Sequence, residues 1–278
     1  MMPQDMQCDT SHRPDWPALL EQAATIVESY DTLVTLRQLF YRLVAVGLLP
    51  NTTNAYKSLS RYTAEARRDG TFPALMDRGR MIHRNETFAS PTAARRWLQS
   101  IYRRDRTEGQ TVSLYLGVEK AGIVAQLEEW FGDLGVPIVA LGGYSSQTYV
   151  DEVAADALAA KRPAVLLYAG DHDPSGEDID RDFLERTACF DEVRRVALTA
   201  DQVEQYALPP QPGKETDSRA RGFVERHGRL VQVELDALPP DILQGLFEAA
   251  IEEFFDATRY QAVLVRETKE RRSLAAKG

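Results

Sequence analysis

Short apolar runs alternate with helical segments between residues 112 and 198, and this alternation limits the possible folds more than any other feature. The runs are VSLYLGV at 112–118, PIVAL at 137–141, AVLLYAG at 164–170 and VRRVAL at 193–198. After each of the first three runs, a short polar turn leads into a stretch with helical spacing of its apolar residues. Strands and helices that alternate at this spacing predict a parallel α/β sheet with crossover helices.

The first 70 residues have a different pattern, with three helical stretches joined by tight connections. We expect helices at 16–30, at 35–47 and from Asn51 or Thr52 to residue 68. Asp15 and Thr35 are suitable N-caps, and Gly47 is a suitable stop signal. Three short helices with tight turns predict a helix-turn-helix or winged-helix-like module, with a plain helical bundle as the alternative.

The chain is long enough, at 278 residues, for two ordinary domains with a sizeable core. We expect a winged-helix-like DNA-binding domain at 14–88, a basic helical linker at 89–110, a sheet domain with a C-terminal extension at 111–256, and a C-terminal helix or tail at 257–278. The predicted fold class is therefore α/β, with a helical N-terminal domain followed by a Rossmann-like parallel sheet domain.

The charge is distributed unevenly along the chain. The net charge is −9, which on its own argues against a protein that coats nucleic acid. Residues 61–108, however, carry 11 Lys and Arg against 6 Asp and Glu, while residues 109–278 carry 18 against 30. We expect Arg61, Arg67 and Arg68, close to the helical module, to contact DNA phosphates, with a solvated helix surface as the alternative. Lys214, in the polar loop at 212–223, is a further predicted DNA contact.

Several classes of protein are disfavoured by composition. No stretch reaches 18 apolar residues, so a transmembrane helix is not expected, and the polar N-terminus has no apolar signal region. Cys8 and Cys189 are too few for a disulfide framework or a zinc site built from cysteines. We therefore expect a cytoplasmic, nucleoid-associated protein without membrane attachment.

Three acidic residues directly follow two of the predicted strands. Glu119 follows the first run, and Asp171 and Asp173 follow the third. In parallel α/β sheets, ligands bind beyond the carboxyl ends of the strands, so these side chains should meet there. Gathered carboxylates repel one another unless they are protonated or bridged by a cation, and Mg²⁺ prefers such oxygen ligands. The spacing therefore predicts a Mg²⁺ site, with solvated loop acids as the alternative.

Neighbouring residues receive weaker predictions. His172, between the two aspartates, is expected to point away from them and to have a structural or supporting role. Glu177 is either a supporting acid or simply a favourable residue at the start of a helix. Glu234, in the segment VQVELDALPP, is predicted either to lie beside the site or to form a structural salt bridge.

The motifs around these acids resemble a known family. Val118-Glu119-Lys120 followed by DHDPSG at 171–176 is similar to the Toprim domain of topoisomerases, bacterial primases and OLD-type nucleases. The D-x-D-P-x-G form is most similar to the DNA-cleaving polypeptide of DNA topoisomerase VI and its meiotic relative, in which a winged-helix domain carries an Arg-Asp-x-aromatic-Tyr motif. Residues 37–41, RQLFY, stand in the matching place, with Gln38 instead of Asp. The resemblance covers residues 30–256.

This resemblance implies a function. Tyr41 would attack a phosphodiester of double-stranded DNA and keep a 5′-phosphotyrosyl link, while Glu119, Asp171 and Asp173 would hold Mg²⁺. Arg37, one helical turn before Tyr41, would steady the phosphate or the phenolate. Lys120 is predicted to contact DNA. The family further implies a homodimer, a separate ATPase subunit, and DNA topoisomerase activity of type IIB, an isomerase reaction.

Two other functions fit the same motifs. A Toprim nuclease would hydrolyse DNA with metal-activated water, and Tyr41 would then be a core aromatic residue of an amphipathic helix. A DNA-binding subunit would use the fold without catalysis. We expect a covalent protein–DNA adduct to distinguish the first function from these two.

Overall fold

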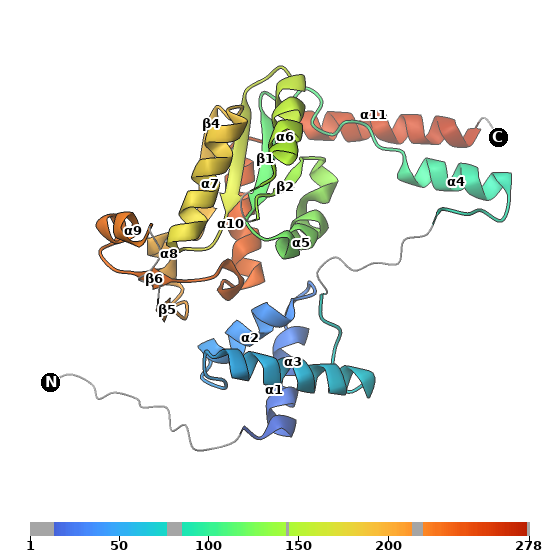
Figure 1. The fold of residues 1–278 in the computed structure, drawn as a ribbon. Helices are drawn as coiled ribbons and strands as arrows, with labels where there is room; N and C mark the ends of the chain where they lie inside the picture. Colours follow the sequence, from blue (N-terminus) through green and yellow to red (C-terminus); the bar gives the residue numbers. More distant parts are fainter. Residues whose placement is uncertain (1–13, 77–84, 143–144, 213–218, 277–278) are drawn as a thin grey trace. The chain divides into compact units, whose positions relative to one another are not determined.

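The computed structural model of the protein describes residues 14–76, 85–142, 145–212 and 219–276 (Figure 1). The chain divides into two compact units, Met1–Met76 and Asp77–Gly278. None of the helices in the described ranges is both long and apolar enough to cross a membrane.

The first unit contains the three predicted helices, α1 (Trp16–Glu28), α2 (Leu36–Ala45) and α3 (Thr53–Arg68). Thr35 and Gln38 form a reciprocal capping box at the start of α2, and the Thr52 side chain caps α3. A single parallel bridge joins Thr35 to Met76, and residues 14–76 contain no β-hairpin that would form a wing. The described part of this unit is therefore a three-helix module.

The second unit is built around the predicted parallel sheet, and the α/β fold class is confirmed. Its strands are β1 (Ser113–Val118), β2 (Ile138–Ala140), β3 (Ala164–Ala169) and β4 (Glu192–Ala197), all parallel and in the order β2-β1-β3-β4. Every residue of β1 and β3 is buried, as expected for central strands covered on both faces. Because β2 and β3 lie on opposite sides of β1, the strand order reverses between β1 and β3.

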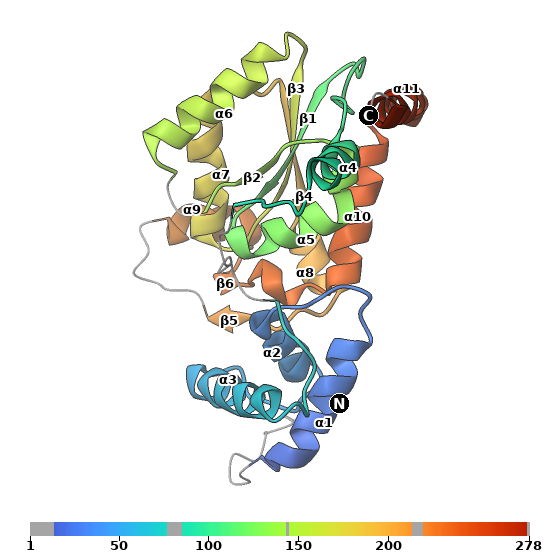
Figure 2. The same ribbon diagram turned by 90° about the vertical axis from the view of Figure 1, so that its right-hand side faces the viewer.

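Helices cover both faces of the sheet (Figure 2). The helices of this unit are α4 (Pro91–Ile101), α5 (Ala121–Phe131), α6 (Gln147–Ala159), α7 (Pro174–Thr187), α8 (Ala200–Gln205), α9 (Ala220–His227), α10 (Pro240–Glu252) and α11 (Ala257–Ala276), with short 3₁₀ turns at Gly132–Leu134 and Leu235–Ala237. Helices α6 and α7 pack on one face through Val150, Val153 and Phe183. Helices α5 and α10 cover the other face, where Phe131 meets Phe247 at 6.2 Å between ring centroids.

The C-terminal extension returns to the carboxyl ends of the strands. Strands β5 (Gln211–Pro212) and β6 (Val231–Gln232) form a small antiparallel ladder. Directly after β6, Val233 forms an antiparallel bridge with His172, with N–H···O distances of 2.8 and 3.0 Å. This bridge fixes the segment from 231 to 237 beside the loop that follows β3.

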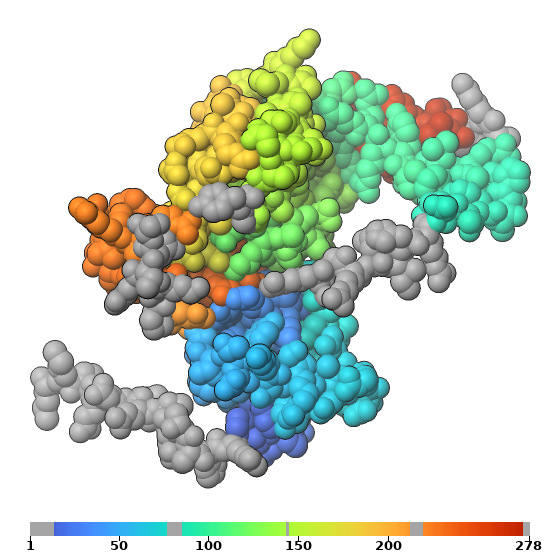
Figure 3. Space-filling model, in the orientation of Figure 1, coloured from blue at the N-terminus to red at the C-terminus, as the bar shows by residue number. Residues whose placement is uncertain are grey.

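Helices α4 and α11 lie side by side and project from the sheet (Figures 1 and 3). The Tyr102 hydroxyl donates to Glu270 Oε2 at 2.5 Å, and the Arg106 guanidinium contacts Glu267 at 2.9 Å. The sequence pattern predicted a linker at residues 89–110 and a separate helix or tail at 257–278. In the structure the two segments pair, because opposite charges more than 160 residues apart come together.

Candidate active site

Glu119 and Asp171 meet at the carboxyl ends of the two central strands. Each residue closely follows its strand, and Val118 of β1 lies beside Ala169 of β3 in the parallel register. The Glu119 backbone N–H donates to Ala169 O at 3.0 Å, and Glu119 Oε2 accepts from the Asp171 backbone N–H at 2.8 Å. The two residues thus flank the point where the strand order reverses, which is where open α/β sheets bind ligands.

Asp173 is the N-cap residue of helix α7. Its Oδ1 accepts a hydrogen bond from the Gly176 N–H at 2.6 Å, which satisfies one of the otherwise unpaired donors of the first turn. Asp171 instead accepts from the Leu235 N–H at 2.8 Å. The two aspartates of the D-x-D motif therefore have different partners, one in α7 and one in the C-terminal extension.

Gly176 permits the close approach of α7 to the two strand ends. A Cβ atom at this position would lie 2.5 Å from Asp171 O and 3.2 Å from Glu119 Oε2. Gly142, after β2, has a similar role, since its Cβ atom would lie 2.7 Å from Glu119 O. Both glycines leave room for backbone to pack directly against the acidic residues.

The ammonium group of Lys120 lies among carboxylates. Its Nζ is 2.8 Å from Asp171 Oδ2, 3.0 Å from Glu234 Oε2 and 3.5 Å from Asp236 Oδ2. Glu234, predicted as an acid beside the site or a salt-bridge partner, is thus both. The inward direction of Lys120 favours a role in balancing these charges over the direct contact with DNA that the sequence predicted.

Burial and repulsion perturb the acids of the site. Burial, followed by the charge of Asp171, raises the pKa of Glu119 to about 7, and Asp173 adds a smaller repulsion. Burial also raises the pKa of Asp171, although Lys120 and the Leu235 N–H oppose the shift. The site therefore holds more negative charge than its surroundings neutralise, which favours protonation of Glu119 or the binding of a cation.

Arg195 braces the loop that carries the D-x-D motif. Its Nη2 donates to the carbonyl oxygens of Gly170 at 3.2 Å and Asp171 at 2.5 Å, while Nη1 pairs with Asp180 of α7 at 2.7 Å. The same guanidinium thus ties the loop after β3 to helix α7 and fixes the backbone from which Asp171 projects.

The donor atoms are of the type that Mg²⁺ prefers, but the carboxylate oxygens of Glu119, Asp171 and Asp173 do not all lie within 4.8 Å of one another in this structure. All three predicted ligands offer carboxylate oxygens, which hard divalent cations prefer. Within the described residues, neither Glu119 Oε1 nor Asp173 Oδ2 accepts a hydrogen bond, while both oxygens of Asp171 contact Lys120. Glu119 and Asp173 each keep an oxygen that a cation could take, Asp171 would be shared between the cation and Lys120, and the three side chains would have to draw together around the ion.

Tyr41 and Arg37 belong to helix α2 of the first unit. Tyr41 is only 3% exposed, and its ring makes an edge-on contact with Phe40 at 5.4 Å between centroids. Arg37 is partly buried. In this state the Tyr41 phenol does not face solvent, so a nucleophilic role requires it to become accessible.

The predicted DNA-contacting arginines lie on helix α3. Arg61, Arg67 and Arg68 are all exposed, and the Arg61 guanidinium lies 4.5 Å from the centroid of the Tyr62 ring. Lys214 lies outside the described residues. The three arginines remain available to an anionic partner.

Three residues of the site were not predicted from the sequence, namely Asp236, Arg195 and His227. Asp236 follows Glu234 in the same segment, and this D/E alternation was its only signal. His227 is the last residue of α9, and the first half of this helix was expected to be a loop. The His227 side chain contacts His172 and Glu177, the two residues for which a supporting role was predicted.

A scan against protein-family models finds no match for this chain, and a search of curated proteins finds none either. Its function is therefore inferred from the residues of the site.

Proposed function

We propose that the protein cleaves DNA strands in a Mg²⁺-dependent reaction, with Glu119, Asp171 and Asp173 as the metal ligands. One observation carries this proposal: carboxylates from two neighbouring parallel strands meet where the strand order reverses. Asp171 is buried and Glu119 is partly buried, their charges repel each other, and a divalent cation would relieve that repulsion.

The bound Mg²⁺ would supply neutralisation of the charge that develops on the scissile phosphate. The residues of the chain position this chemistry. Arg195 fixes the loop of Asp171, and Gly176 brings the N-terminus of α7 to the same edge. Lys120 limits the net charge of the acidic group and opposes the rise in the pKa of Asp171 that burial causes.

In the favoured route, Tyr41 is the nucleophile of a reaction like that of DNA topoisomerase VI. Its phenolic oxygen bonds to phosphorus, the bond from phosphorus to the 3′ oxygen breaks, and the 3′ oxygen takes up a proton. The phenol must lose its proton, which its ordinary pKa near 10 disfavours at neutral pH. Arg37, one turn away on α2, would stabilise the phenolate or the phosphate. A homodimer and a separate ATPase subunit belong to this route.

The burial of Tyr41 favours a second candidate, a hydrolytic nuclease. A side chain that is 3% exposed packs as a core residue, and metal-activated water would then replace it as nucleophile. A DNA-binding subunit without turnover is the remaining alternative.

The test incubates supercoiled plasmid with the full chain and Mg²⁺ and then denatures the protein to trap covalent adducts. We expect the Tyr41→Phe variant to lose both cleavage and adduct, while Tyr56→Phe on α3, as a matched control, keeps both. Cleavage by Tyr41→Phe without an adduct would identify the hydrolytic route. We expect Glu119→Gln, an isosteric change, to abolish cleavage by either route, and full activity of this variant would contradict the metal site.

A further inference from the structure

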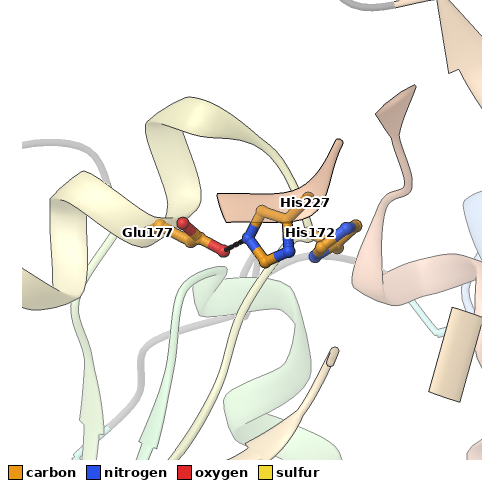
Figure 4. A group of neighbouring side chains, drawn as sticks. All are labelled: His172, Glu177 and His227. Atoms are coloured by element: carbon orange, nitrogen blue, oxygen red, sulfur yellow. Dashed lines mark hydrogen bonds and ion pairs between the residues drawn. The ribbon is translucent and has the colours of Figure 1, made fainter. Parts of the chain in front are cut away.

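Two histidines and a glutamate from three separate segments meet next to the D-x-D loop (Figure 4). His172 follows β3, Glu177 lies in the first turn of α7, and His227 is the last residue of α9. One ligand atom from each lies within 4.8 Å of the other two, and His227 Nε2 is 2.6 Å from Glu177 Oε1. Within the described residues, this is the one group of three or more His, Cys, Asp or Glu side chains that meets this condition.

Each of the three side chains is held by other contacts. The His172 backbone is fixed by its bridge to Val233. The residue is 5% exposed, and its ring packs against Phe223 at 5.0 Å between centroids. Arg226 donates to Glu177 Oε2 at 2.6 Å, which leaves Oε1 directed at His227. Helix α9 ends at His227 because Gly228 takes the left-handed conformation, with φ of 75°. The arrangement is thus built by the surrounding structure.

The chemistry of the three groups matches a transition-metal site. Two imidazoles and one carboxylate are a known ligand set of Zn²⁺, in which a water completes the tetrahedron. Oxygen-preferring Mg²⁺ would not select two imidazoles.

We propose that His172, Glu177 and His227 form a binding site for a Zn²⁺-class divalent transition metal. The site goes beyond the proposed function, since it uses none of the carboxylates assigned to Mg²⁺. Ligand atoms in a tetrahedral Zn²⁺ site are about 3.3 Å apart, so His227 Nε2 and Glu177 Oε1, now 2.6 Å apart, must separate slightly to admit the ion. Glu177 and His227, whose side chains are 20% and 21% exposed, can rotate, while His172 is the fixed anchor.

Metal binding would join three elements. The ion would take the place of the hydrogen between His227 Nε2 and Glu177 Oε1, while the neutral imidazole keeps its proton on Nδ1. It would link the end of α9 and the first turn of α7 to His172, which lies between Asp171 and Asp173. The metal would therefore stabilise the loop that carries the D-x-D motif.

The test measures Zn²⁺ binding to the full chain at pH 7 by competition with a chromophoric chelator, together with thermal unfolding. We expect one tight equivalent and a higher Tm with Zn²⁺, since the ion binds only the folded state. His227→Gln and Glu177→Gln should each weaken binding by about a hundredfold or more, because loss of even an outer partner costs 10–100-fold. Glu185→Gln, an exposed residue of α7, is the matched control and should bind as the wild type does.

Glu119→Gln separates this site from the carboxylate site. We expect this variant to keep the tight Zn²⁺ equivalent and to lose Mg²⁺-dependent cleavage, so that the two proposals fail independently. The far-ultraviolet circular dichroism of each metal-free variant verifies its fold. The proposal is overturned if the wild type binds no tight Zn²⁺, if folded His227→Gln binds it equally well, or if Glu119→Gln abolishes the binding.

Discussion

Gly176 shows how one residue sets the geometry of the acidic site. Because it has no side chain, Asp171 O and Glu119 Oε2 can lie close to its Cα atom. These two residues follow two different strands. A flexible side chain could rotate away from an added methyl group, but the Asp171 carbonyl cannot, because it belongs to the backbone and accepts from Arg195. An alanine at this position would therefore have to push α7 away from the strand ends.

We expect Gly176→Ala to lower the free energy of unfolding by about 1–3 kcal/mol, the usual cost of overpacking a tight site. Gly245→Ala on the exposed side of α10 is the control, because its Cβ atom would meet nothing within 4 Å. Alanine is the better helix former, so this variant should gain about 0.5–1 kcal/mol. Urea denaturation followed by circular dichroism measures both. An unchanged Gly176→Ala variant would contradict the close approach described here.

Some of the residues that meet at the acidic site can be predicted from the sequence, and others cannot, for a physical reason. Glu119 and Asp171 could be predicted to meet, because parallel strands place their carboxyl ends at one edge of the sheet. Asp236 and His227 could not, because they reach the site through a 3₁₀ turn and a short helix whose positions depend on tertiary packing. The inward direction of Lys120 likewise depends on Glu234 and Asp236, more than 110 residues away.

Helices α4 and α11 show at the scale of elements why a basic stretch need not bind DNA. Three arginines that follow α4 pair with acids inside the second unit. Arg103 pairs with Asp133, Arg104 with Glu108 and Glu270, and Arg106 with Glu267 and Asp133. Part of the positive charge found between residues 61 and 108 therefore stabilises the fold.

The buried pair of Arg106 and Glu267 makes the stability of the pairing between the α4 region and α11 depend on pH. The hydrogen bond from Arg106 is the main reason why the pKa of Glu267 is lowered. A carboxylate with a lowered pKa in the folded state adds stability above its unfolded pKa of about 4.3, and the contribution is lost as the pH falls through the folded pKa. Glu267 is 2% exposed and Arg106 is 8% exposed, so the loss of one partner leaves a buried charge.

We expect Glu267→Gln to lower the free energy of unfolding by roughly 3 kcal/mol at pH 7, in the range for breaking a buried ion pair. The difference from wild type should shrink as the pH falls from the unfolded pKa of about 4.3 through the lowered folded pKa, where wild-type Glu267 becomes protonated as well. Glu225→Gln breaks an exposed pair with Arg221 and serves as control, with an expected change below about 1 kcal/mol. Denaturant unfolding at a series of pH values tests this, and a difference that grows toward low pH would contradict it.

The elements themselves differ in how well the sequence predicts them. Strands β1 and β3 are continuous apolar runs because both of their faces are buried, and both were predicted. The capping box of α2 also has a clear local signal in Thr35 and Gln38. Helices α8 and α9 were missed, since 6 and 8 residues are too few to establish a helical period and their stability comes from packing.

At the scale of the whole molecule, the net charge of −9 combines two different surfaces. The exposed arginines of α3 belong to the first unit, and within the described residues none of Arg61, Arg67 and Arg68 pairs with a carboxylate. The acidic group of Glu119, Asp171 and Glu234 belongs to the second unit. We therefore expect the full chain to bind DNA weakly at moderate salt in the presence of a chelator, and more tightly with Mg²⁺.

The location of the DNA-binding surface can be tested at the same scale. Replacing Arg61, Arg67 and Arg68 together with Gln should weaken DNA binding, and each lost phosphate contact should reduce the slope of log K against log salt by about 0.9. Replacing Arg194, Arg229 and Arg266 changes the net charge equally but removes arginines that already pair with acids. Fluorescence anisotropy with duplex DNA over a salt series compares the two. If both triple variants weaken binding alike, the whole-molecule charge governs affinity and α3 is not the interface. If only the first triple variant weakens binding, the arginines of α3 contact the DNA.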